Sequence, residues 1–182
     1  MKIRDSSNLK PQSPYAIFKI KIEKYLLKQK KKTNFKFIIL RLGTIYGYSP
    51  GMRFHTAVNK FCFQAKINLP ITVWRTAYNQ YRPYLSLLDF SRLINFIISK
   101  NIFNNDIYNA VSYNMTVKDI INIIKLRVNK VTIQYTNEKI MNQLSYKVIN
   151  TRLSKLGFRF RSDIKKEIFD QLDKINLKNN LK

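Results

Sequence analysis

The chain has 182 residues, 45% of them hydrophobic, and 34 Lys and Arg against 10 Asp and Glu give it a formal net charge of +24. This length is sufficient for one domain with its own core. No apolar stretch is long enough to cross a membrane, and polar residues rather than an apolar signal region follow Met1, so we expect a cytoplasmic protein without membrane contact. A single Cys62 and a single His55 exclude an internal disulfide and a cysteine-based zinc cluster, so no metal is expected.

The positive charge raises nucleic acid as a partner. Lys, Ile and Asn are abundant together, as an AT-rich coding bias would produce, and the lysines are scattered, with residues 30–32 as the one run of three. Nucleic-acid sites usually concentrate charge on one face. We therefore expect no specific nucleic-acid partner, and a basic nucleic-acid-binding domain stays an alternative.

Predicted helices and strands alternate along the chain, which is typical of an α/β fold. Ser13 as N-cap and Pro14 in the first turn open a helix predicted to end near residue 31, and residues 35–40 form an apolar run typical of a parallel strand buried on both faces. Three of the four glycines fall in the loop 43–51. The later predicted elements are helices at 53–66, 88–99, 116–127 and from 162 onward, and strands at 71–74, 107–111 and 131–135.

The segment from Ser13 to Lys19 reads SPYAIFK, with Tyr15 and Lys19 four residues apart at the start of the first helix. This spacing brings both side chains to one helix face, with Cβ atoms about 5–6 Å apart. Because an ammonium group beside a phenol favours the phenolate, the pair can act as an acid/base near neutral pH while a nicotinamide takes or gives hydride. A Tyr and a Lys at this spacing also occur by chance on solvated helices.

Further segments extend the motif in the same order. Residues 13–23 resemble the active-site helix SPYxxSKxxxE of extended short-chain dehydrogenases/reductases, and residues 37–47 (FIILRLGTIYG) resemble the strand and loop that follow it. Later segments resemble that group's substrate loop, RPFxHVxDxxRA element, YNVG strand, TxxE helix and KLGF turn, at residues 49–54, 81–92, 107–111, 116–121 and 155–158. Over residues 8–173 the chain therefore resembles the C-terminal portion of NAD-dependent epimerases/dehydratases that act on nucleotide sugars.

The resemblance implies an incomplete Rossmann-like parallel sheet with a small substrate-binding α/β lobe. It implies that Tyr15 is the catalytic acid/base, that Lys19 assists it, and that both contact the nicotinamide end of NAD or NADP. Thr44 lies where these enzymes often have an Asn beside cofactor and substrate. Arg82, and with less support Arg53, would contact the phosphates of a nucleotide-sugar substrate.

The same comparison suggests roles for other positions. Arg41, at the end of a predicted strand, is expected in an internal ion pair. Tyr46 and Tyr84 are expected to pack rather than to bind a ligand, and His55 is expected to lie in a loop or helix without a catalytic role.

The sequence departs from the pattern in two respects. None of its glycines follows a first strand, so the GxxGxxG turn that cradles the cofactor pyrophosphate is not seen. The catalytic Ser or Thr that normally precedes the Tyr would fall before Met1. We therefore expect residues 1–173 to be the C-terminal part of such a domain and residues 174–182 to be a disordered basic tail, with NAD binding only when an N-terminal nucleotide-binding half is supplied.

Three interpretations remain open. The chain is one half of a split enzyme that joins a separate N-terminal half, with a homodimer also conceivable, or it is a truncated gene fragment that is inactive alone. In the third interpretation it is a non-catalytic remnant that binds a nucleotide sugar or a protein partner. The sequence does not distinguish epimerisation, dehydration and reduction.

Overall fold

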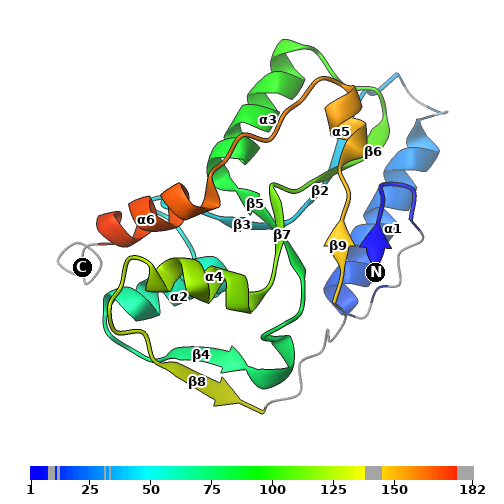
Figure 1. The fold of residues 1–182 in the computed structure, drawn as a ribbon. Coiled ribbons are helices and arrows are strands. Elements are labelled where there is room, and N and C mark those ends of the chain that lie inside the picture. Colours follow the sequence, from blue (N-terminus) through cyan, green and yellow to red (C-terminus); the bar gives the residue numbers. More distant parts are fainter. Residues whose placement is uncertain (8–10, 12, 31, 33, 138–144, 176–182) are drawn as a thin grey trace.

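The computed structural model describes residues 1–7, 11, 13–30, 32, 34–137 and 145–175. In this part of the chain, short strands and helices form an α/β fold (Figure 1). The helices are α1 (Pro14–Gln29), α2 (Ala57–Lys66), the 3-10 helix η1 (Arg75–Ala77), α3 (Leu87–Ser99), α4 (Val117–Lys125), α5 (Thr151–Lys155) and α6 (Ile164–Lys174). The strands are β1 (Lys2–Ile3), β2 (Ile38–Leu42), β3 (Thr44–Tyr46), β4 (Ile71–Trp74), β5 (Arg82–Ser86), β6 (Asp106–Ala110), β7 (Tyr113–Met115), β8 (Ile133–Thr136) and β9 (Lys147–Val148).

The strands pair mainly in parallel, as the predicted fold class requires. β2 pairs with β6, β3 with β5, β4 with β8 and β1 with β9, all in parallel, and only β7 runs antiparallel, beside β5. In the longest pair, Ile38 lies opposite Asp106 and Leu42 opposite Ala110. No helix of the described residues is long and apolar enough to cross a membrane.

The β2–β6 pair lies between α1 and α3 (Figure 1). Because side chains alternate along a strand, Ile38 and Leu40 of β2 join the core on the α3 side, where Leu93 is fully buried, and Arg41 faces α1. The buried members of this first core are Leu85, Leu93, Ile97, Tyr108, Ala110, Leu153 and Phe158.

A second core fills the lobe formed by α2, α4, α6 and the β4–β8 pair. Thr116 and Asp119 form a capping box that starts α4, whose residues Ile120 and Ile124 are fully buried. Cys62 of α2 is also buried in this core. The lobe therefore has its own apolar interior, as the sequence predicts for a small α/β unit.

Several predicted boundaries differ from the observed ones. β2 begins at Ile38 rather than at 35. It is half-buried rather than fully buried, because among the described residues it pairs with one strand only, and the helix that it faces, α1, has no buried side chains. α2 begins at Ala57, after Thr56, instead of at 53. β3, β5 and β7 were not among the predicted strands. β3 and β7 have only three residues each, too few to show a period, and β5 contains Pro83, which argues against a strand. The tail predicted from 174 lies, from 176 onward, outside the described residues.

Asp89 in the first turn of α3 connects three parts of the fold. Its side chain is fully buried and accepts hydrogen bonds from the backbone N–H groups of Arg161 at 2.9 Å and Ser162 at 3.2 Å, and from Ser112 Oγ at 2.8 Å. Arg92 Nη1 adds an ion pair at 2.8 Å. Burial by itself would raise the pKa of Asp89, but the hydrogen bonds outweigh it and lower the pKa below its ordinary value. A charged carboxylate thus ties α3 to the β6–β7 connection and to the segment before α6.

Asp89→Asn should lower the free energy of unfolding by about 2–4 kcal/mol, because the amide keeps the size of the side chain but removes the charge that compensates these buried donors. Urea unfolding would measure the loss. Asp170→Asn is the matched control, since it breaks the exposed Lys174–Asp170 pair on α6 and should cost less than about 0.5 kcal/mol. Equal losses in the two variants would contradict the role given to Asp89.

Glu167 connects α6 to the end of β5. Ser86 Oγ donates a hydrogen bond to Glu167 Oε1 at 2.9 Å. Burial raises the pKa of Glu167, and the nearby charges of Asp89 and Asp163 raise it further. The fold therefore makes ionisation of this carboxyl less favourable than it is in the unfolded chain.

This raised pKa predicts a pH dependence of stability. Because the folded chain holds the Glu167 proton more tightly than the unfolded chain, the stability from this group should decrease as the pH rises from the ordinary value of 4.5 through the raised pKa. Glu167→Gln cannot ionise but can still accept from Ser86, so its stability relative to the wild type should increase over the same window. Urea unfolding in a pH series tests this; a constant difference would contradict it.

Candidate functional site

The candidate catalytic residues lie on the first two turns of α1. Ser13 Oγ accepts a hydrogen bond from the backbone N–H of Ala16 at 3.2 Å, which confirms Ser13 as the N-cap, and Pro14 follows in the first turn. The cap fixes where the helix begins. It thereby fixes the direction in which Tyr15 and Lys19 leave the backbone.

Tyr15 and Lys19 are brought together on one face of α1. The Lys19 Nζ atom lies 5.4 Å from the centroid of the Tyr15 ring, so the ammonium group faces the ring rather than the hydroxyl oxygen. The Tyr15 side chain is 71% exposed. The pair has the residue types and the proximity needed for acid/base chemistry, and its phenol is open to a ligand.

An ion pair holds this helix against the sheet. Arg41 on β2 binds Glu23 on α1 through two nitrogens, with Nε 2.9 Å from Oε1 and Nη2 2.6 Å from Oε2. Arg41 Nη1 also donates to the backbone oxygen of Asp5 at 3.0 Å. The internal ion pair predicted for Arg41 is confirmed. Glu23 is the last residue of the SPYxxSKxxxE pattern, so the pattern contains both the candidate catalytic pair and the residue that anchors its helix.

Thr44 lies at the start of β3, immediately after Gly43. A Cβ atom on Gly43 would lie 3.0–3.1 Å from the backbone of Pro83 and Tyr84, so only glycine allows β3 to approach β5 this closely. The Thr44 side chain is exposed. Tyr46, two residues further along the same strand, is buried. Burial, followed by the charge of nearby Glu167, raises the pKa of Tyr46. Tyr46 therefore stays protonated and packs in the core, as predicted.

The two candidate phosphate ligands occupy different surroundings. Arg53 is exposed in the loop before α2. Arg82, at the start of β5, donates to Gln80 Oε1 at 2.9 Å and to the backbone oxygen of Tyr81 at 3.1 Å, and its guanidinium lies 5.5 Å from the ring centroid of Tyr146. Arg82 is thus held in one orientation by local contacts. The structure places Tyr15 and Lys19 side by side on α1. The other three candidates lie on separate elements: Thr44 on β3, Arg53 in the loop that follows it, and Arg82 on β5.

Sequence reasoning did not assign a role to Asp89, Glu167 or Glu23, although each lies in a recognisable motif or helix. The Asp89–Arg92 spacing of three was the available signal, because it places both side chains on one face of α3. Ser86, which stands where the pattern usually has His, caps α3 by accepting from the backbone N–H of Leu88 at 3.1 Å. His55 is exposed in a loop, as expected.

The described residues match only part of a dinucleotide site. Tyr15, Lys19 and Thr44 are the candidates for the nicotinamide end. The four glycines are Gly43, Gly47, Gly51 and Gly157, and none lies in a turn from a strand into a helix N-terminus that could hold a pyrophosphate. Among the described residues no cluster of His, Cys, Asp and Glu could bind a metal ion.

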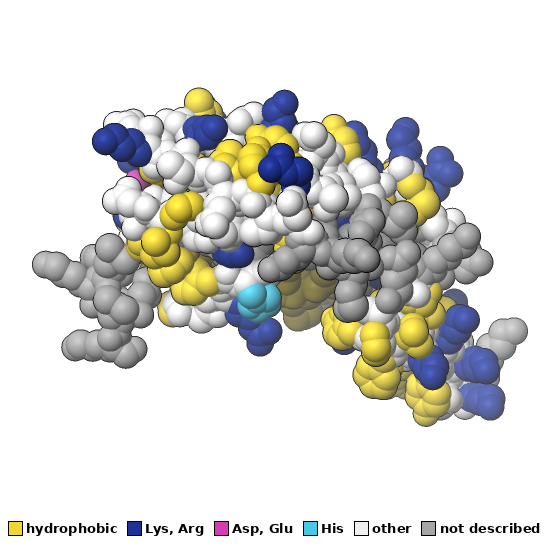
Figure 2. Space-filling view, turned by 90° about the horizontal axis from the view of Figure 1, so that it is seen from below, with side chains coloured by type: hydrophobic (Ala, Val, Ile, Leu, Met, Phe, Trp, Pro, Cys, Tyr) yellow, Lys and Arg dark blue, Asp and Glu magenta, His cyan; other side chains and the backbone are white. Residues whose placement is uncertain are grey.

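Basic side chains are interspersed with other side chains on one face of the molecule and along α1. Figure 2 shows one face on which Lys and Arg side chains are interspersed with apolar and neutral ones. On α1 itself, basic residues alternate with exposed apolar residues.

Comparisons with known proteins place this geometry in a family. Residues 2–110 match the NAD dependent epimerase/dehydratase family. Among solved structures, a UDP-glucuronic acid 4-epimerase from Bacillus cereus, in complex with NAD and a fluorinated UDP-sugar, has a TM-score of 0.84 at 18% identity over 95% of this chain and 55% of that chain. A UDP-glucose 4-epimerase from Thermus thermophilus with NAD has a TM-score of 0.75 at 20% identity over 94% of this chain and 58% of that chain.

A dTDP-glucose 4,6-dehydratase from Streptomyces venezuelae, with NAD and TYD bound, has a TM-score of 0.81 at 16% identity and covers 95% of this chain and 54% of that chain. The chain thus spans little more than half the length of these proteins, and at such identities the likeness establishes the fold. The family match covers more than half of the chain and includes the α1 motif and the β2 strand. The chain belongs to the NAD dependent epimerase/dehydratase family.

Proposed function

We propose that this chain supplies the acid/base and the substrate-binding lobe of an NAD-dependent nucleotide-sugar epimerase or dehydratase, and that it acts only together with a nucleotide-binding half. The observation that carries the proposal is the Tyr15–Lys19 pair, exposed on a helix that Ser13 caps and the Arg41–Glu23 ion pair anchors. The solved epimerases and the dehydratase named above contain NAD, and the Bacillus cereus epimerase also holds a UDP-sugar. A single buried Cys62 without a disulfide partner fits a cytoplasmic setting.

In the proposed mechanism Tyr15 exchanges a proton with a hydroxyl group of the sugar. Lys19, whose ammonium group lies 5.4 Å from the centroid of the Tyr15 ring, places a positive charge beside the acid/base and contributes to the binding of the nicotinamide ribose. NAD, or NADP, accepts or returns a hydride when it is bound. Thr44 orients the sugar, and Arg82, with Arg53 as a weaker candidate, binds the phosphates of the nucleotide.

The surface of α1 supports the need for a nucleotide-binding half. None of its residues is buried, and Tyr15, Phe18 and Tyr25 expose 71%, 60% and 62% of their surface. In the part of the chain that the structure describes, β2 pairs with β6 alone, so its second edge is open to another parallel strand. An open parallel edge beside an uncovered helix is the surface that an α/β unit would complete, whether that unit is part of the same polypeptide or a separate one.

The 182-residue chain alone should bind NAD weakly, because the residues available hold only the nicotinamide end and no pyrophosphate-binding turn. Calorimetric titration would show no saturation at micromolar NAD. Micromolar or tighter binding by this chain alone would contradict the proposed division of the site.

Once a nucleotide-binding half is supplied by fusion or co-expression, turnover of a nucleotide sugar should depend on Tyr15. Tyr15→Phe keeps the ring but removes the ionisable oxygen, so it should lower kcat by about 100-fold or more. Lys19→Ala should lower kcat and weaken NAD binding together. Since the two residues act as a unit, the double variant should be little worse than the poorer single one.

Tyr25→Phe is the matched control, because it removes an equally exposed phenol from the same helix and should leave turnover unchanged. Steady-state rates with UDP-glucose and dTDP-glucose would measure these effects. A reconstituted, folded enzyme that turned over normally with Phe at position 15 would contradict the assignment. Substrate binding without any turnover would instead favour a non-catalytic binding remnant.

A further inference from the structure

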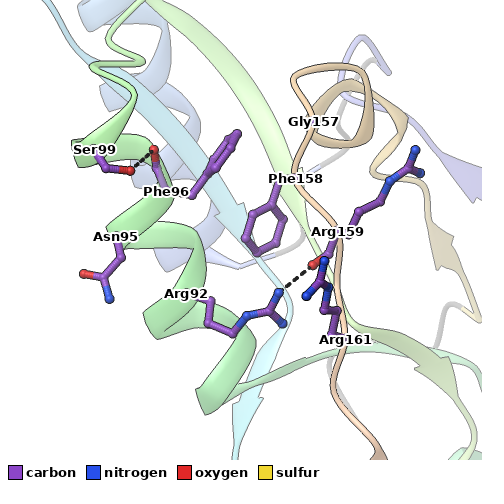
Figure 3. Close-up of a pocket in the computed structure, with 8 residues that line it drawn as sticks. All are labelled: Arg92, Asn95, Phe96, Ser99, Gly157, Phe158, Arg159 and Arg161. Atoms are coloured by element: carbon purple, nitrogen blue, oxygen red, sulfur yellow. Dashed lines mark hydrogen bonds between the residues drawn. The ribbon is translucent and has the colours of Figure 1, made fainter.

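A groove of about 430 Å³ opens between α3 and the extended segment that leads from α5 to α6 (Figure 3). Arg92, Asn95 and Phe96 from one face of α3 form one wall, and Phe158 and Arg161 lie across from them. We refer to these five residues as the α3 groove. None of the candidate active-site residues contributes to it. Its volume falls within the range of small-molecule sites, about 300–1,000 Å³.

The floor of the α3 groove is aromatic and belongs to the core. Phe158 is buried, and its ring centroid lies 5.5 Å from that of Phe96 and 5.0 Å from that of Phe160. Phe96 is half-buried, so part of its ring faces the groove. A Cβ atom on Gly157 would meet nothing within 4 Å, which leaves this end of the groove open. A flat ring could therefore lie on a surface that is already in place.

The rim of the α3 groove is cationic. Arg92 uses two of its five N–H donors, Nη1 on Asp89 Oδ1 at 2.8 Å and Nη2 on the backbone oxygen of Arg159 at 3.2 Å. These bonds hold its guanidinium in place and leave other donors for a ligand. The backbone N–H of Arg161 binds the same Asp89 oxygen, so both arginines are positioned around one carboxylate.

Of the three arginines that line the groove, only Arg92 forms an ion pair with a described residue. Asp89 neutralises Arg92, whereas the side chain of Arg161 is exposed and forms no ion pair with a described residue. Figure 3 shows the guanidinium groups of Arg92 and Arg161 extending toward each other, while Arg159 turns away. None of the residues that line the groove is acidic. An anion between the two guanidinium groups would relieve their repulsion and accept hydrogen bonds from both.

We propose that the α3 groove binds a nucleoside phosphate, with the phosphate between Arg92 and Arg161 and the base against Phe96. Planar guanidinium groups match phosphate oxygens, and an aromatic floor suits a flat base. Asn95 lies at the edge of the groove, and its side chain is exposed. This site is separate from the proposed nucleotide-sugar site and does not depend on it.

Calorimetric titration of the full chain with AMP, inorganic phosphate and adenosine tests the proposal. AMP should bind more tightly than either component, because the rim and the floor both contribute. Arg161→Ala should weaken AMP binding by about tenfold, the effect of losing one charge-assisted hydrogen bond. Arg4→Ala is the matched control, since it removes an exposed arginine that has no described ion pair and lies outside the groove, and it should change binding less than about twofold.

Asn95→Asp is a second variant, which places a carboxylate in the groove at an exposed helix position and should also weaken AMP binding. Thermal unfolding of each variant shows that the fold is kept. Equal losses in Arg161→Ala and Arg4→Ala would overturn the proposal in favour of diffuse attraction, as would AMP binding no tighter than that of phosphate. AMP binding lost in Arg82→Ala but kept in Arg161→Ala would assign the nucleotide to the other site.

Discussion

The buried carboxylate of Asp89 is the interaction on which the arrangement of the rest of the fold depends. A charge without solvent is costly unless donors surround it, and here the donors come from α3 itself, the β6–β7 connection and the segment before α6. Because these segments are far apart in sequence, one side chain fixes their relative positions. Glu167 reaches the adjacent Ser86, so α6 is fixed at a second point. The walls of the α3 groove are held by the same carboxylate.

α1 is held against the sheet by an ion pair rather than by buried apolar side chains. This helix contributes no buried side chain, and a bidentate ion pair between Glu23 and Arg41 connects it to β2. Because desolvation offsets much of its attraction, this largely buried ion pair contributes less to stability than a buried apolar face would, but its bidentate geometry sets an orientation. The helix that presents Tyr15 and Lys19 is therefore directed by charge on one side and left uncovered on the other. In the proposed function, the uncovered side is where the nucleotide-binding half completes both the core and the cofactor site.

The two lobes of the chain differ in how completely each one buries its own apolar side chains. The lobe of α2, α4 and α6 encloses its own apolar core, with Val58, Ile71 and Ile168 fully buried. The β2–β6 part is covered by α3 on one face, and α1 on the other exposes Tyr15, Phe18 and Tyr25. Burial of apolar surface is the main stabilising term of a fold. Most of the stability of the isolated chain should therefore come from the lobe of α2, α4 and α6 and from the packing of α3 on the β2–β6 pair. A family member that spans little more than half of its structural relatives would show this asymmetry.

The sequence by itself determined the fold class and the family, and it identified Tyr15 and Lys19 as the candidate catalytic pair. The Ser13 cap, the spacing of Tyr15 and Lys19, the capping box at Thr116 and the strand at 71–74 all follow from local rules that need no partner segment. Arg41 was assigned to an ion pair, but its partner Glu23 could be identified only in three dimensions. The short strands β3, β5 and β7, the half-burial of β2, the buried donors around Asp89 and the convergence of Arg92 and Arg161 were decided by tertiary structure. Each of these depends on contacts between residues far apart in the chain, which local periodicity and spacing do not encode.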